Sequence, residues 1–271
     1  DLEQEWEELD IAQDIWICRD ETNSICGYAA VAKEDARIVQ DVYIDPGTTP
    51  EGVEDDLMGL CGQRVYELTG SGVATEPVDL AGFVTAVNSR LQAAYERAGF
   101  SRHTWHYRMR IDFSELFAAP VWPEGYTLAA YQHKDEQELY ELIQAAFDWP
   151  GHVRHPIEFW RNLVFRGGRY DPQYFVLVRH QGELVAAALC YEEDDRGWIR
   201  QLAVDKDYQG RGLGGFLLRH MFSVFSCNGK NSVGLGVASV NDKAWQFYER
   251  NGMYRDREYI EYRMPITQSV T

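Results

Sequence analysis

The sequence predicts an α/β (α+β) protein built from two related domains in tandem, each a mixed, mostly antiparallel sheet flanked by helices. The first observation is a chain of 271 residues, which is longer than the commonest single domain. The second is an internal repeat, and the third is an order of strand-like and helix-like apolar patterns that recurs in both halves. With 45% hydrophobic residues the chain has material for two cores, and this composition excludes an intrinsically disordered chain.

The repeat is clearest between residues 88–99 and 241–252. The first segment reads NSRLQAAYERAG and the second NDKAWQFYERNG, so the asparagine, tyrosine, glutamate, arginine and final glycine coincide without a gap. Two shorter pairs keep the same order: 42–45 with 202–205, and 106–111 with 261–266. Three pairs at a nearly constant offset indicate two copies of one folding unit.

The predicted boundaries are 1–113 for the first domain, 114–125 for a linker and 126–271 for the second domain. In the linker, Pro120 and Pro123 interrupt the periodicity, and no long apolar pattern crosses it. The first domain has much less sequence before its first clear strand than the second, and the chain begins with Asp1 rather than Met. We therefore expect that an opening strand and helix of the first domain are missing from this sequence.

The opening part of the second domain is expected to form a strand, two helices and a three-stranded meander. Residues 126–131 alternate like a strand, 135–147 repeat apolar residues at helical spacing, and 156–165 resemble a short second helix. The expected meander strands are 174–179, 184–191 and 198–204, separated by turns at 181–182 and 192–197.

The closing part alternates helices and strands. A helix is expected at 212–225, a strand at 232–237, a helix at 242–250 and a last strand at 254–266. A meander followed by helix–strand–helix–strand predicts a mixed sheet with helices packed on it. The first domain follows the same order from Asp14 onward.

The most informative segment is 202–215, which reads LAVDKDYQGRGLGG. A strand runs into a glycine-rich turn that opens a helix, where free backbone N–H groups and the positive end of the helix suit a pyrophosphate. Arg211 adds a fixed positive charge, and the absence of Gly-Lys-Ser/Thr excludes a Walker loop. A helix start whose glycines serve only tight packing is the alternative. The candidate contacts are Leu202, Ala203, Val204, Gln209, Gly210, Arg211, Gly212, Leu213, Gly214 and Gly215.

These residues resemble the GCN5-related N-acetyltransferase (GNAT) superfamily. Its acyl-CoA loop, Gln/Arg-x-x-Gly-x-Gly/Ala, is matched by Gln209, Gly212 and Gly214. Its second hallmark, Asn-x-x-Ala-x-x-Phe-Tyr-x-x-x-Gly-Phe, is matched at Asn241, Ala244, Phe247, Tyr248 and Gly252, with Met253 in place of the last Phe. The likeness extends more faintly over the first half, so the whole is similar to the tandem arrangement of mycothiol synthase. The resemblance implies acetyl-CoA as co-substrate, no metal, and direct transfer of the acyl group to an amine.

The resemblance also implies roles for individual residues. A backbone N–H of strand 198–204 stabilises the developing oxyanion, and Tyr248 protonates the leaving thiolate. Asn241 and Tyr248 are also expected to contact the cofactor. The alternatives are a plain N-cap for Asn241 and a packed helix aromatic for Tyr248.

The residue that deprotonates the amine is harder to assign. Many members of the superfamily have a carboxylate on the strand matched by 198–204, where this chain has Arg200 and Gln201. Gln201 and Glu192, the latter acting through water, are the candidates, and a solvated acidic turn is the alternative for Glu192. In the loop between the first two helices, Trp149 and His152 are candidate acceptor contacts; a packed Trp and a surface His are the alternatives.

The first-half loop tests the assignment. Aligned from Asp45, it reads TPEGVE at 49–54 opposite QGRGLG at 209–214. Pro50 removes a donor, and Glu51 and Glu54 bring negative charge to the position of a pyrophosphate. We therefore predict a single CoA site, in the second domain, and structural roles for Asn88 and Tyr95.

Charge and cysteine content limit the remaining classes. Lys+Arg 26 against Asp+Glu 43 gives −17, which argues against nucleic-acid or anionic-membrane binding. The five cysteines form no CxxC pair, so neither a zinc site nor a disulfide framework is predicted, and the expected location is cytoplasmic. A non-catalytic acyl-CoA sensor and a cofactor-free scaffold are the alternatives to an enzyme. The acceptor, a small-molecule or peptide amine, and the oligomeric state stay open.

Overall fold

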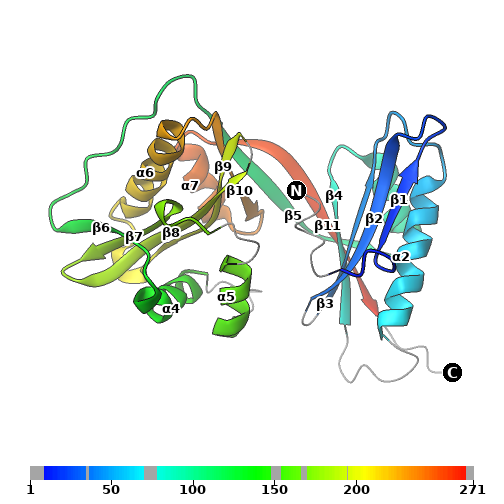
Figure 1. The fold of residues 1–271 in the computed structure, drawn as a ribbon, viewed down its shortest axis with the longest axis horizontal. Helices are drawn as coiled ribbons and strands as arrows, with labels where there is room; N and C mark the ends of the chain where they lie inside the picture. The colour runs from blue at the N-terminus through cyan, green and yellow to red at the C-terminus, as the bar shows by residue number, and fades with distance from the viewer. Residues whose placement is uncertain are drawn as a thin grey trace. The chain divides into compact units, whose positions relative to one another are not determined.

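The computed structural model describes residues 9–34, 37–69, 78–147, 154–165, 170–193 and 195–266 (Figure 1). Contacts divide the chain into two compact units. Unit 1 comprises Asp1–Tyr107, Ala238–Asn241 and Arg257–Thr271, and unit 2 comprises Arg108–Val237 and Asp242–Asp256.

The described residues of unit 1 form a mixed sheet with two helices. Its elements are β1 (Ile15–Arg19), β2 (Ile25–Glu34), β3 (Arg37–Ile44), α2 (Val53–Thr69), β4 (Val78–Thr85), α3 (Ser89–Arg97), and parts of β5 (Ser101–Asp112) and β11 (Tyr254–Ile266). Strands β1, β2, β3, β4 and β11 are neighbours in that order; in the described part of the chain β3 pairs with β4 in parallel, and the pairs β1–β2, β2–β3 and β4–β11 are antiparallel. Side chains of α2, α3 and the sheet form one buried core, with Tyr95 among its fully buried members.

Unit 2 contains the glycine-rich segment. Its helices are α4 (Glu136–Ala146), α5 (Ile157–Phe165), α6 (Leu213–Cys227) and α7 (Asp242–Arg250), with short 3₁₀ turns η1 (His133–Asp135), η3 (Pro172–Tyr174) and η4 (Lys206–Tyr208). Its strands are β6 (Tyr126–Ala130), β7 (Phe175–His180), β8 (Glu183–Glu193), β9 (Arg196–Val204) and β10 (Ser232–Ala238), together with parts of β5 and β11. Strands β10, β9, β8, β7 and β6 are neighbours in that order, and β9–β10 is the parallel pair.

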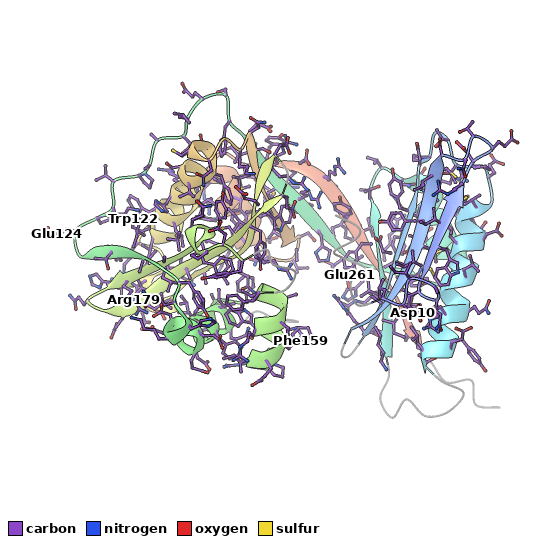
Figure 2. All side chains as sticks on the ribbon, viewed as in Figure 1. Asp10, Trp122, Glu124, Phe159, Arg179 and Glu261 are labelled. Atoms are coloured by element: carbon purple, nitrogen blue, oxygen red, sulfur yellow. The ribbon has the colours of Figure 1, made fainter. Side chains whose placement is uncertain are left out.

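Both faces of the unit 2 sheet are covered, which explains why β8 is an almost continuous apolar run. Leu189 packs with α4 and α5, while Phe225 of α6 packs on Gly197 of β9. The carboxylates of Asp135, at the end of η1, and of Glu138 on α4 hold Arg179 of β7, which is labelled in Figure 2. Strands buried on both faces lose the strict polar alternation of a half-exposed sheet.

The predicted fold class is confirmed, and α7 and β11 have the bounds expected from the sequence. The compact units nevertheless divide the chain differently from the repeat. The last strand of the second repeat pairs antiparallel with β4, from Tyr259 opposite Thr85 to Ile266 opposite Val78, and so belongs to unit 1. The boundaries 1–113, 114–125 and 126–271 describe the sequence repeat and stay a prediction, since contacts between strands depend on partners remote in the chain.

Candidate functional site

The glycine-rich loop adopts a backbone that L-residues with a side chain rarely adopt. Gly210 has a φ of 75°, and Gly212, the residue before α6, has a φ of 81°. Both values lie in the left-handed region that glycine enters without steric cost. The two glycines let β9 reach α6 through a tight turn.

That turn presents a run of free hydrogen-bond donors. Among the described residues, the backbone N–H groups of 210–214 donate to no protein atom, whereas the next two, of Gly215 and Phe216, donate to the Gly212 carbonyl. Consecutive unpaired N–H groups at the positive end of a helix form an anion site. The loop therefore has the geometry that a phosphate group requires.

The side chains of the loop hold the turn in place. The Gln209 side-chain amide donates to the Val204 carbonyl at 3.1 Å. The Arg211 guanidinium donates to the Asp207 carbonyl at 2.8 Å and lies 4.9 Å from the centre of the Tyr208 ring. These contacts fix the path of the backbone and keep a positive charge beside it.

The next two glycines permit close packing of α7 on α6. A Cβ on Gly214 would lie 3.4 Å from Phe247, and a Cβ on Gly215 would lie 3.3 Å from the side-chain oxygen of Asn251. The two sequence interpretations therefore apply to different glycines: Gly210 and Gly212 serve the turn, and Gly214 and Gly215 serve packing.

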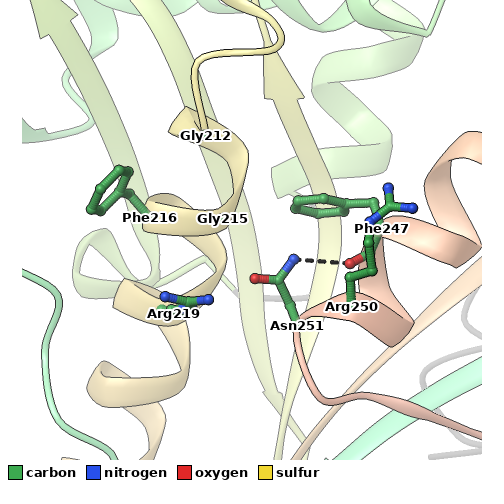
Figure 3. Close-up of a pocket in the computed structure, with 7 residues that line it drawn as sticks. All are labelled: Gly212, Gly215, Phe216, Arg219, Phe247, Arg250 and Asn251. Carbon is green, nitrogen blue, oxygen red and sulfur yellow. Dashed lines mark hydrogen bonds between the residues drawn. The ribbon is translucent and has the colours of Figure 1, made fainter.

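A hollow of about 360 Å³ opens beside this helix start (Figure 3). Its lining residues come from α6 and from the end of α7: Gly212, Gly215, Phe216, Arg219, Phe247, Arg250 and Asn251. Figure 3 shows Arg219 on α6 and Arg250 on α7, with Asn251 bonded to the Phe247 carbonyl at 2.9 Å. Sequence reasoning missed Phe216, Arg219, Arg250 and Asn251. The sequence feature that could have identified Arg219 is its spacing, one helical turn after Gly215.

Strand β9 has an open edge next to the loop. Its parallel pairing with β10 covers Arg196–Trp198, and the described part of the structure gives no partner on that side for Ile199–Val204. On the other side, Leu189 pairs with Gln201 and Cys190 with Ile199, so Arg200 is the extra residue of a bulge. Leu202, Ala203 and Val204 pair with β8, so the β8–β9 pairing continues as far as the loop. An open strand edge can bind an extended amide-containing ligand.

Tyr248 lies on α7, half-buried, with its ring 5.2 Å from that of Phe247. Desolvation, with a smaller contribution from the Cys190 thiol, raises the pKa of Tyr248 to about 12. The phenol therefore stays protonated at neutral pH and can donate a proton or a hydrogen bond. Asn241 comes directly before α7, and its backbone N–H donates to the Ala238 carbonyl at 3.0 Å.

The other predicted catalytic residues are held by neighbours. The Glu192 carboxylate accepts from the Tyr174 hydroxyl and lies 3.3 Å from Lys230 Nζ. The Gln201 side-chain oxygen accepts from Trp160 Nε1 at 3.1 Å. Glu192 lies where the β8–β9 hairpin turns, whereas the glycine-rich loop follows the other end of the hairpin, at Val204. Six residues separate these two ends along β8, which is about 20 Å at 3.3 Å per residue. Trp149 and His152 lie outside the described residues, so their contacts stay a prediction.

Unit 1 carries the counterpart of the loop at the start of α2, filled by protein groups. The Arg90 guanidinium donates to the carbonyls of Thr49, at 2.7 Å, and Pro50, and to the buried Glu54 carboxylate. The hydrogen bond from Arg90 lowers the pKa of Glu54 below its usual range. With each repeated segment aligned separately, Gly214 stands at the position of Glu54 in the loop segment and Lys243 at the position of Arg90 in the segment 88–99. The Glu54 carboxylate thus occupies the helix start of unit 1, at the position where unit 2 has Gly214.

The two hallmark residues retained in unit 1 have structural roles. The Asn88 side chain accepts from the Leu91 N–H at 3.1 Å and caps α3. Tyr95 is fully buried, against Phe100 and Tyr262. Both were expected to be structural.

Searches for other site types give two findings. The described residues contain no cluster of three or more His, Cys, Asp or Glu side chains arranged to hold a metal ion. Within the same residues, no helix has the length and apolarity needed to cross a membrane.

Comparisons with known proteins identify the family of the chain. The acetyltransferase (GNAT) family model matches residues 136–253. A mycothiol acetyltransferase of Beutenbergia cavernae is 26% identical over 92% of this chain and 83% of its own length. N-alpha-acetyltransferase 30 of Schizosaccharomyces pombe is 24% identical over 50% of this chain and 89% of its own.

Solved structures match along nearly the whole chain. A GCN5-related N-acetyltransferase from Sphaerobacter thermophilus aligns with a TM-score of 0.84 at 24% identity, over 99% of this chain and 86% of that one. A tandem GNAT protein from the clavulanic acid biosynthesis pathway aligns with a TM-score of 0.71 at 16% identity, over 94% and 83%. At these identities the likeness shows the fold alone.

Proposed function

Because the chain belongs to the GNAT superfamily and is an acyl-CoA-dependent N-acetyltransferase, we propose that unit 2 holds its one acetyl-CoA site, with the pyrophosphate on the loop Gln209–Gly214. The observation that carries this proposal is the run of unpaired backbone N–H groups at the left-handed glycines. The pantetheine arm then extends along the open edge of β9, away from the loop. Tyr248 of α7 completes the cofactor contacts within unit 2.

The proposed chemistry is direct transfer. Bound acetyl-CoA supplies a thioester whose carbonyl carbon the acceptor amine attacks, so a C–N bond forms and the C–S bond breaks. A backbone N–H on the open edge of β9 stabilises the oxyanion, and Tyr248 gives its proton to the leaving thiolate.

For the amine proton we keep Glu192 as the proposed acceptor, through intervening water. Glu192 lies at the end of the hairpin toward which the pantetheine arm points, and its carboxylate is 3.3 Å from Lys230 Nζ. Gln201, whose oxygen already accepts from Trp160, is proposed to orient the acceptor rather than to take a proton.

The acceptor is proposed to be the amine of a small molecule. Support comes from the mycothiol acetyltransferases, which match this chain over most of its length, whereas the N-alpha-acetyltransferase 30 of Schizosaccharomyces pombe matches half of it. Peptide amines are the second class to test.

Calorimetric titration with acetyl-CoA tests the site. We expect one molecule bound per chain, and no binding by Gly214→Glu, which gives unit 2 the carboxylate that unit 1 has at Glu54. Two unit charges at close range repel by several kcal/mol at an effective dielectric constant of about 20. Gly214→Gln, which adds nearly the same bulk beside Phe247 without the charge, is the matched control and should bind acetyl-CoA more tightly than Gly214→Glu.

Two results contradict the proposal. Binding of acetyl-CoA by Gly214→Glu with unchanged affinity excludes the loop as the pyrophosphate site. A second molecule bound with comparable affinity contradicts the assignment of unit 1 as a non-binding copy.

A further inference from the structure

The hollow beside the loop contains two arginines that the protein itself does not neutralise. Among the described residues, neither Arg219 nor Arg250 has an ion pair or a hydrogen bond, and no carboxylate lines the hollow. The chain as a whole has a formal charge of −17, so acidic side chains are abundant elsewhere. Two free guanidinium groups facing one hollow in so acidic a chain indicate an anionic ligand.

Unit 1 provides an internal comparison for this hollow. At the position of Arg250, unit 1 has Arg97, which donates three hydrogen bonds to the Asp55 carboxylate, at 2.7, 2.9 and 3.2 Å. The gapless alignment puts Gly215 of unit 2 opposite Asp55, and Arg219 opposite Gly59. The unit 1 position is therefore internally neutral, and the unit 2 position carries two free positive charges.

Size and lining favour a nucleotide over a free phosphate ion. A volume of about 360 Å³ lies in the range of small-ligand sites. The rings of Phe216 and Phe247 line the same hollow and offer apolar faces to a base. Arg219 follows Gly215 by one turn, which is about 6 Å along the helix axis. One sugar ring bridges such a separation between two phosphate groups.

We propose that Arg219 and Arg250 bind the 3′-phosphate of the CoA nucleotide and make the chain selective for CoA over 3′-dephospho-CoA. This inference rests on the proposed acetyl-CoA site, whose loop binds the pyrophosphate. A phosphate monoester carries nearly two negative charges at neutral pH, and planar guanidinium groups bind its oxygens in pairs. The nucleotide end of CoA is thereby anchored independently of the thioester end.

Calorimetry with CoA and 3′-dephospho-CoA tests the inference. We expect the parent to bind CoA at least about tenfold more tightly than dephospho-CoA, since charge-assisted hydrogen bonds are lost with the phosphate. In the double variant Arg219→Gln, Arg250→Gln, the affinity for CoA should fall to that for dephospho-CoA, and the affinity for dephospho-CoA should stay within about twofold of the parent value. Arg97→Gln, at the matching position of unit 1, should leave both affinities unchanged.

The other outcomes contradict either the role of the two arginines or the acetyl-CoA site itself. Equal affinities in the parent, or a double variant that loses both nucleotides equally while keeping its circular dichroism, excludes selection by these arginines. Failure of the parent to bind either nucleotide contradicts the acetyl-CoA site itself. Both arginine side chains are exposed, so the variants are expected to fold.

Discussion

Tyr95 and Tyr248 occupy the same position of the repeat but have different surroundings. Tyr95 is fully buried in the core of unit 1, where its hydroxyl donates to the Gln40 carbonyl at 3.4 Å. Tyr248 is half-buried on α7, where it interacts with the Cys190 thiol of β8, and its pKa is raised to about 12. One residue type thus has a packing role in one unit and the means for proton transfer in the other.

This difference gives a matched pair of substitutions. Tyr248→Phe should lower kcat by about 10²-fold with little change in CoA affinity, because it removes the proton for the leaving thiolate. Tyr95→Phe should leave kcat unchanged and lower the free energy of unfolding by about 1 kcal/mol or less. Steady-state kinetics and urea denaturation of both variants measure this. Equal kcat for parent and Tyr248→Phe removes Tyr248 from the chemistry.

At the scale of elements, a buried carboxylate of unit 1 links strands β5 and β11 through a hydrogen bond. Glu261 of β11 is buried, with its carboxylate 2.9 Å from His106 Nε2 of β5 and 2.6 Å from Arg263 Nε. Burial alone raises the pKa of Glu261, but the hydrogen bonds from His106 and Arg263 outweigh it and lower the pKa to about 2. The ionised carboxylate therefore stabilises the folded unit.

The pH dependence of that contribution follows from the direction of the shift. The folded-state pKa of about 2 lies below the ordinary value of 4.5, so the stabilisation is fully present above about pH 4.5 and is lost as the pH falls toward 2. Glu261→Gln should lower the free energy of unfolding by on the order of 1–3 kcal/mol at pH 7, and less at pH 3. Urea denaturation between pH 7 and 2.5 measures both.

The exposed Glu51→Gln is the control for the Glu261 substitution, and its stability curve should run parallel to that of the parent. A stability loss for Glu261→Gln that does not change with pH contradicts an electrostatic origin.

At the scale of the whole molecule, the chain contains two copies of one fold that differ in the charged residues at the start of the helix after the loop. Arg90 and Glu54 fill the helix start of unit 1, and Arg97 is neutralised by Asp55. In unit 2 the places of Glu54 and Asp55 hold Gly214 and Gly215, and the place of Arg97 holds Arg250, which has no ion pair among the described residues. The strand that ends the second repeat completes the sheet of unit 1, so each copy also needs part of the other's sequence.

The tandem architecture bears on the acceptor. We expect the chain to acetylate small primary amines or amino sugars at least about tenfold faster, in kcat/KM, than peptides with free N-termini, since binding contacts made only by the preferred acceptor improve transition-state stabilisation. Acetyl transfer to a panel of both classes, followed by mass spectrometry, measures this, with Gly214→Glu as the background. Preference for peptides contradicts the proposed acceptor class.

The sequence by itself determined the repeat, the fold class and the bounds of α7 and β11, because apolar periodicity and turn residues act over a few positions. It also located the loop 209–214, since a glycine pattern encodes backbone torsions locally. Tertiary structure decided which side chains meet. Arg219 and Arg250 line one hollow although they lie on different helices, Arg90 reaches Glu54 across 36 positions, and Glu192 is held by Tyr174 and Lys230. These pairings depend on how distant helices and strands pack, which no local pattern of the chain specifies.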